Sequence, residues 1–137
     1  FQRRYKLLML EKQIQLDINR LFSSEEFYSD TKNRENIHHL TTLWSHCLND
    51  DVYKQGIHEI VAICYKITYD GIQNNFLVHK KDVDLFHLNH LCPANLMHVS
   101  FDLASNLMKF VYPLYNDDSK MSGRMNLIQN RLLMKID

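Results

Sequence analysis

Two short motifs carry side chains suited to phosphate chemistry. The first, IxxDxxR, runs from Ile14 to Arg20, and the second, YxQG, runs from Tyr53 to Gly56. Arg20 has a permanent charge and a planar fork of donors, which suits it to neutralising negative charge that develops on phosphate oxygens. Gln55 carries a donor and an acceptor on one neutral amide, which suits it to holding an attacking water beside a second polar group.

The residues around Arg20 have a supporting chemistry. Asp17 lies three positions earlier, so both side chains face the same side of a helix and an ion pair could hold the arginine extended. Asp17 also falls between Ile14 and Leu21 on an apolar stripe. Because a buried carboxylate needs partners, we expect Asp17 to organise the segment that carries Arg20.

The second motif predicts a constrained turn. We expect the ring of Tyr53 to pack while its hydroxyl bonds nearby backbone, which would fix the turn that presents Gln55. Gly56 allows a close approach or a backbone geometry that a side chain forbids. Taken singly, these residues are typical of ordinary turn packing, and Asp17 with Arg20 is typical of a helical ion pair. Their occurrence together, followed by the run at 56–59, favours a functional site.

The two motifs, in this order, resemble the catalytic signatures of the TBC domain, a helical module that activates GTP hydrolysis by Rab GTPases. The resemblance continues through residues 56–60, where the family usually has QGMNE or QGMHE, and it includes residues 24–28, 33–37 and 126–133. Within the family, the chain resembles the TBC1-domain member-5-like subgroup.

The resemblance implies an all-α fold, an irregular multi-helix bundle of the TBC type. It implies that Arg20 acts as an arginine finger and that Gln55 replaces the switch glutamine of the GTPase, both in trans. The protein would then be an activator and not itself an enzyme, and the partner would hold the GTP and Mg²⁺. The supporting residues that the resemblance implies are Asp17, Ile14, Tyr53, Gly56 and Glu59.

The partner implied is a Rab-family GTPase, together with complexes of vesicle and endosomal membrane trafficking. The alternative is a catalytically silent TBC-like scaffold that binds a GTPase or a trafficking complex through the same face.

The third family signature lies downstream of the late helix, so we interpret residues 1–137 as the N-terminal and central part of the domain. Residues 74–95 align poorly with the family, which indicates either a divergent insert or residues missing from the sequence at this point. The family commonly has a proline soon after the arginine, whereas here Arg20 is followed by residues 21–24, which contain none.

Composition permits this interpretation. The 137 residues, 45% hydrophobic and 11% aromatic, suffice for one domain with a core. Sixteen basic and sixteen acidic residues leave no net charge to attract nucleic acid or anionic lipid. The apolar runs are too short to insert into a bilayer. Three widely spaced cysteines indicate reduced thiols and a cytoplasmic location. The family resemblance implies that partners hold the protein at endosomal or Golgi membranes.

Histidine suggests a competing function, a metal-binding adaptor. His38 and His39 are adjacent, and His87, His90 and Cys92 form a short cluster, but no second pair of ligands completes a tetrahedral zinc site. We therefore expect no metal and no cofactor held by this chain. The sequence also lacks a glycine-rich phosphate loop. His58, beside the glutamine motif, is expected to be a packed or capping residue.

Apolar periodicity predicts the helices that position the motifs. The first is expected over residues 3–22, followed by a polar loop to residue 33. The second is expected over 36–48 and the third from just after Gly56 to about 70–71. Residues 63–69 could also be read as a strand. Further helices are expected over 82–91, over 97–111 with an end at Pro113, and over 121–136.

Overall fold

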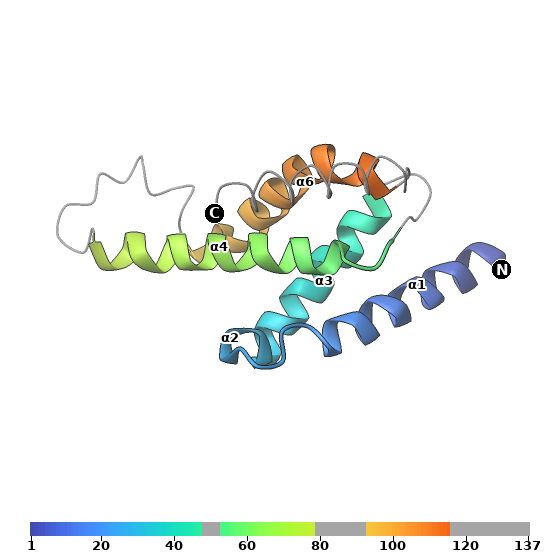
Figure 1. Ribbon diagram of the computed structural model, residues 1–137, viewed down its shortest axis with the longest axis horizontal. Coiled ribbons are helices and arrows are strands. Elements are labelled where there is room, and N and C mark those ends of the chain that lie inside the picture. The colour runs from blue at the N-terminus through green and yellow to red at the C-terminus, as the bar shows by residue number, and fades with distance from the viewer. Residues whose placement is uncertain (48–52, 79–92, 116–137) are drawn as a thin grey trace, which may run out of the picture. The chain divides into compact units, whose positions relative to one another are not determined.

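The computed structural model describes residues 1–47, 53–78 and 93–115. All of the elements in these ranges are helices, which confirms the all-α prediction (Figure 1). The chain divides into two compact units, residues 1–105 and 106–137, and the description below concerns the first unit unless stated. The helices are α1 (Gln2–Asn19), α2 (Glu26–Ser29), α3 (Thr31–Cys47), α4 (Ile57–Val78), the short 3₁₀ helix η1 (Pro93–Asn95) and α6 (Leu96–Tyr115), which continues into the second unit.

Helix α3 organises the first unit because it packs against α1, α2 and α4, while α1 also contacts α4 (Figure 1). The long helices α1, α3 and α4 bury residues spaced three or four apart, as a helix with one apolar face must. These buried side chains form one core and remove its apolar surface from water, which is the main force that holds the helices together. Its members include Ile14, Ile18, Ile37, Leu40, Trp44, Ile57, Val61, Cys64 and Tyr65.

Helix α1 ends sooner than its apolar pattern predicts. It stops at Asn19, with Arg20 as the residue that caps it, and not at residue 22. Phe22 adopts a positive φ of 33°, a left-handed conformation that cannot continue a right-handed helix. The early end leaves Arg20 at the helix terminus instead of within the last turn.

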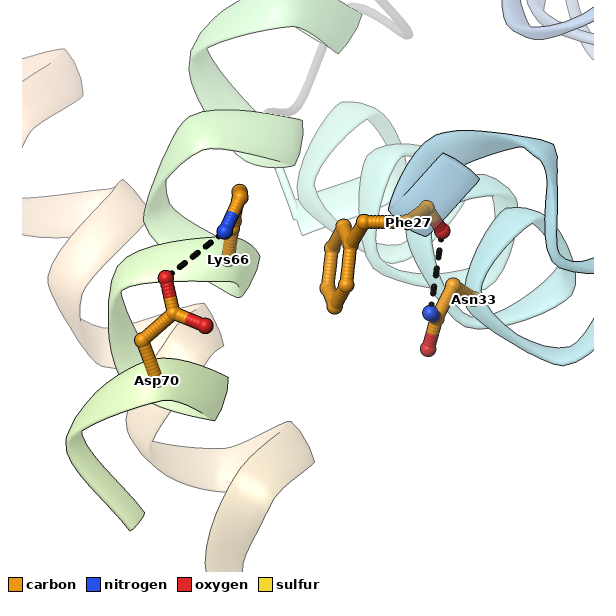
Figure 2. A network of polar contacts seen from close by, with 4 residues as sticks. All are labelled: Phe27, Asn33, Lys66 and Asp70. Carbon is orange, nitrogen blue, oxygen red and sulfur yellow. Dashed lines mark hydrogen bonds and ion pairs between the residues drawn. The ribbon is translucent and has the colours of Figure 1, made fainter. Parts of the chain in front are cut away.

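The polar loop predicted after α1 is only partly correct, because it contains α2 and the start of α3. Helix α3 begins at Thr31 and not near Asn36. A carboxylate oxygen of Asp30 accepts a hydrogen bond from the backbone N–H of Asn33 at 3.0 Å, as the side chain that precedes a helix commonly does. The amide of Asn33 also donates to the carbonyl of Phe27 at 3.0 Å, which ties α2 to α3 (Figure 2).

Helix α4 extends beyond the predicted end at residues 70–71 and runs to Val78. Gly71 lies inside it, where a single glycine costs only about 0.5–1 kcal/mol relative to alanine. Ile72 is buried and continues the apolar face, so packing outweighs that cost. The alternative strand over residues 63–69 is wrong, since this segment is part of the same helix. Helix α6 likewise continues past Pro113 to Tyr115.

An aromatic cluster, made of Phe27, Tyr28, Tyr65 and Tyr69, holds α2 against α4. The ring of Phe27 lies 5.1 Å from that of Tyr28, 5.9 Å from that of Tyr65 and 5.0 Å from that of Tyr69, between centroids. Lys66 places its ammonium group 4.9 Å from the centre of the Phe27 ring (Figure 2). The cluster therefore anchors the segment that follows Arg20.

Hydrogen bonds satisfy the buried polar end of this cluster. The hydroxyl of Tyr65 donates to Oδ1 of Asn33 at 2.9 Å and accepts from the amide of Asn36 at 3.0 Å. Burial raises the pKa of Tyr65 above its ordinary value of 10.0. Because Asn33 and Asn36 both lie on α3, these two hydrogen bonds fix the position of α4 along α3.

The helices predicted over residues 82–91 and 121–136 lie outside the described residues, as do His87, His90 and Cys92. Within the described ranges, no helix combines the length and hydropathy needed to cross a bilayer.

Candidate functional site

Arg20 follows the last residue of α1 and its side chain is exposed. Its backbone N–H donates to the carbonyl of Asp17 at 3.1 Å, which fixes the backbone at the helix end. Among the described residues, no ion pair or hydrogen bond engages the guanidinium group. The position therefore leaves a charged, forked donor free to meet another molecule.

Gln55 lies in the turn that leads into α4, and its side chain is also exposed. The backbone N–H of Ile57 donates to the carbonyl of Lys54 at 3.1 Å, and that of Glu59 donates to the carbonyl of Gly56 at 3.1 Å. Gly56 has a φ of 102°, a backbone region that residues with a Cβ rarely adopt. The expected special geometry at Gly56 is present.

Asp17 joins the first motif to the second. Its carboxylate, on a residue only 3% exposed, accepts a hydrogen bond from the hydroxyl of Tyr53 at 2.7 Å. The amide of Gln13 lies 3.4 Å from both carboxylate oxygens. The expected ion pair between Asp17 and Arg20 is not formed: the buried carboxylate turns toward these partners while the guanidinium stays in solvent.

His58 completes this arrangement and was not expected to be a site residue. Its Nδ1 lies 2.9 Å from the hydroxyl of Tyr53. The expectation placed backbone beside this hydroxyl, and the structure places the side chains of Asp17 and His58 there. Burial lowers the pKa of His58 below its ordinary value of 6.5, and the negative charges of Asp17 and Glu59 partly oppose that shift. The sequence signal was its position, three residues after Gln55.

Asp17, Tyr53 and His58 are called here the three-residue network. Two other predicted residues, Ile14 and Glu59, are close to its members in the sequence. Ile14 is fully buried and anchors the last turns of α1 in the core. Glu59 is exposed in the first turn of α4, where a negative charge complements the helix dipole. Glu59 therefore stabilises the start of α4 through its negative charge.

The described residues contain no group of three histidine, cysteine or acidic side chains placed to hold a metal ion. An exposed guanidinium and an exposed carboxamide belong to two motifs that are joined by the half-buried hydrogen bond between Tyr53 and Asp17. Such groups can stabilise an anionic transition state and orient a water molecule.

Comparison with families of known proteins gives a match. The family model of the Rab-GTPase-TBC domain matches residues 2–137, nearly the whole chain. Searches of curated proteins and of solved structures found no match. The member-5-like subgroup stays a prediction. Because the family model covers far more than half of the sequence, the chain belongs to the Rab-GTPase-TBC domain family.

Proposed function

We propose that this chain accelerates GTP hydrolysis by a Rab-family GTPase and that Arg20 and Gln55 enter the nucleotide site of the partner. The observation that carries the proposal is the hydrogen bond between Tyr53 and Asp17, which joins the two motifs within the folded chain. Both reactive side chains are exposed, while of the residues that connect their motifs Asp17 is buried and Tyr53 is half-buried.

The chemistry assigned to each group follows from its structure. Hydrolysis of GTP builds negative charge on the phosphate oxygens, and Arg20 would neutralise it, a contribution of about 10³–10⁵ in rate for arginine fingers generally. Gln55 would hold the attacking water through its carbonyl oxygen and a second polar group through its amide. The GTPase would hold the GTP and Mg²⁺, so this chain acts as an activator.

The cellular setting of the proposal is the cytoplasm, at endosomal or Golgi membranes reached through partners in vesicle trafficking. Two observations are compatible with that setting. Cys47 and Cys64 are free thiols, as expected in a reducing compartment. Burial also raises the pKa of the Cys64 thiol, which keeps it protonated and unreactive.

A single-turnover hydrolysis assay over a panel of GTP-loaded Rab proteins tests the proposal. Arg20→Ala and Gln55→Ala should each abolish the stimulation without changing helical content by circular dichroism. Arg20→Lys should retain little of the stimulation, because an ammonium group lacks the planar fork of donors. Arg3→Ala and Gln73→Ala are matched controls, since both side chains are exposed on the helices that carry the motifs.

Stimulation that survives Arg20→Ala would refute the assigned mechanism. Binding of a Rab protein without any stimulation across the panel would refute the activating function and support the scaffold instead. Size-exclusion chromatography with GTP-loaded and GDP-loaded Rab proteins measures that binding directly.

A further inference from the structure

We infer that His58 is a positioning residue, held with its proton on Nδ1, that clamps the turn carrying Gln55. The activity arm of this inference rests on the proposed function. Its structural arm rests on the three-residue network alone, in which the Tyr53 hydroxyl lies 2.7 Å from Oδ2 of Asp17 and 2.9 Å from Nδ1 of His58.

The position of the proton follows from counting donors. The hydroxyl of Tyr53 has one proton, and it is donated to the carboxylate of Asp17, which can only accept when ionised. The contact between the same oxygen and Nδ1 of His58 then needs a proton from the imidazole. The geometry thus selects the Nδ1–H tautomer, with hydrogen bonds running from His58 to Tyr53 to Asp17.

The network spans the turn in question. Tyr53 precedes Gln55, and His58 lies in the first turn of α4, so the bond between them closes a short loop that contains Gln55 and Gly56. Backbone hydrogen bonds within this loop involve Lys54, Gly56 and residues of α4. The side chain of Gln55 is exposed and has no hydrogen bond within the described residues, so the clamp fixes its backbone and leaves its amide available.

Burial makes the clamp strong enough to matter. His58 is 5% exposed and Asp17 is 3% exposed, so little water competes for these bonds. Loss of the imidazole donor would leave the Tyr53 oxygen with one partner fewer in a poorly solvated place, a situation that favours movement of the turn. A displacement of about 1 Å at a reacting group can lower a rate about 10²-fold.

The structural arm is tested by nuclear magnetic resonance on ¹⁵N-histidine-labelled protein at neutral pH. We expect the His58 ring to show a protonated Nδ1 and an unprotonated Nε2. Tyr53→Phe removes the acceptor, so the ring should shift toward the Nε2–H form that free histidine prefers. A ring found as Nε2–H in the unmodified protein would overturn the inference, as would a ring unaffected by Tyr53→Phe.

The activity arm compares two substitutions at one position. In His58→Asn the amide nitrogen can occupy the place of Nδ1 and donate, whereas His58→Leu fills similar space without a donor. We expect His58→Asn to keep the stimulated rate constant within about threefold and His58→Leu to lower it at least about tenfold at saturating Rab concentration. Equal rates for the two variants would overturn the positioning role.

The two proposals fail in different ways. Absence of stimulation by the unmodified protein would reject the proposed function, while the tautomer measurement would still decide the hydrogen-bond order. If His58→Leu does not fold, Tyr53→Phe serves as the second variant for the rate. It removes the same link from the other side and is expected to lower the stimulated rate to a similar extent.

Discussion

The hydroxyl of Tyr53 lies 2.7 Å from Oδ2 of Asp17, although the two residues are 36 positions apart in the sequence. Asp17 belongs to the last turns of α1, and Tyr53 precedes α4. The bond joins two buried or half-buried groups, so it is shielded from competing water and gives the two segments one defined alignment. Alignment of this kind is what paired catalytic groups on separate segments require.

Tyr53→Phe is therefore expected to lower the free energy of unfolding by about 1–3 kcal/mol, because it leaves a buried carboxylate short of a donor. Urea unfolding followed by circular dichroism measures the change. Tyr69→Phe is the matched control: its ring packs against Phe27, but its hydroxyl makes no hydrogen bond to another described residue. Equal stability losses in the two variants would show that the contact to Asp17 contributes nothing specific.

The same substitution at two glycines should have opposite effects. Gly56 has a φ of 102°, where a Cβ is strained, so Gly56→Ala should destabilise the protein by about 1–3 kcal/mol. Gly71 lies within α4 and a Cβ built on it meets no heavy atom within 4 Å, so Gly71→Ala should stabilise by about 0.5–1 kcal/mol. Thermal and urea unfolding of both variants measure the signs. A stabilising Gly56→Ala would contradict the strained turn.

The sequence predicted the elements whose evidence is local. The apolar stripe through Ile14 and Ile18 marked the buried face of α1, and the residues following Gly56 marked the start of α4. Asp17 was expected to be buried because of its place on that stripe, and it is. In each case the spacing of neighbouring residues determines burial, so no distant contact was needed.

What the sequence could not predict depends on distant contacts. The carboxylate of Asp17 was assigned to Arg20, its helical neighbour, because the approach of Tyr53 is visible only in the folded chain. His58 was passed over for the same reason. The early start of α3 is different, because its signal is local. Asp30 is a common residue type at helix starts, and it caps α3 by accepting a hydrogen bond from Asn33. The polar composition of the segment obscured this signal in the sequence.

Stability should decrease as the solution becomes more acidic, in part through His58. Its pKa is below 6.5 in the folded protein because of burial, with Asp17 and Glu59 opposing, whereas the unfolded chain takes up the proton near 6.5. Below that pH the unfolded state binds more protons, so the contribution is full above 6.5 and is lost as the pH falls toward the folded pKa.

Urea unfolding between about pH 7.5 and 5.5 measures this loss, and His58→Asn is the reference because its side chain does not titrate. The unmodified protein should lose more stability over that interval than the variant does. Identical pH profiles would show that the imidazole of His58 titrates alike in the folded and unfolded states, contrary to its burial.

The aromatic cluster should contribute more stability than the ion pair beside it. Lys66 and Asp70 are joined at 2.7 Å, but their side chains are 33% and 50% exposed, so water and salt screen the pair (Figure 2). Asp70→Asn should cost less than about 1 kcal/mol, and this cost should shrink in high salt. Phe27→Leu removes ring contacts with Tyr28, Tyr65 and Tyr69 and should cost about 1–3 kcal/mol at any salt concentration.

Urea unfolding of both variants at low and high ionic strength separates the two contributions. Lys66 also lies over the Phe27 ring, so Asp70→Asn leaves that contact in place and tests the ion pair alone. Because the cluster anchors the segment that follows Arg20, Phe27→Leu should also weaken stimulated GTP hydrolysis, whereas Asp70→Asn should not. If Asp70→Asn proved the more damaging of the two, the ion pair within α4 would contribute more stability than the aromatic packing between α2 and α4.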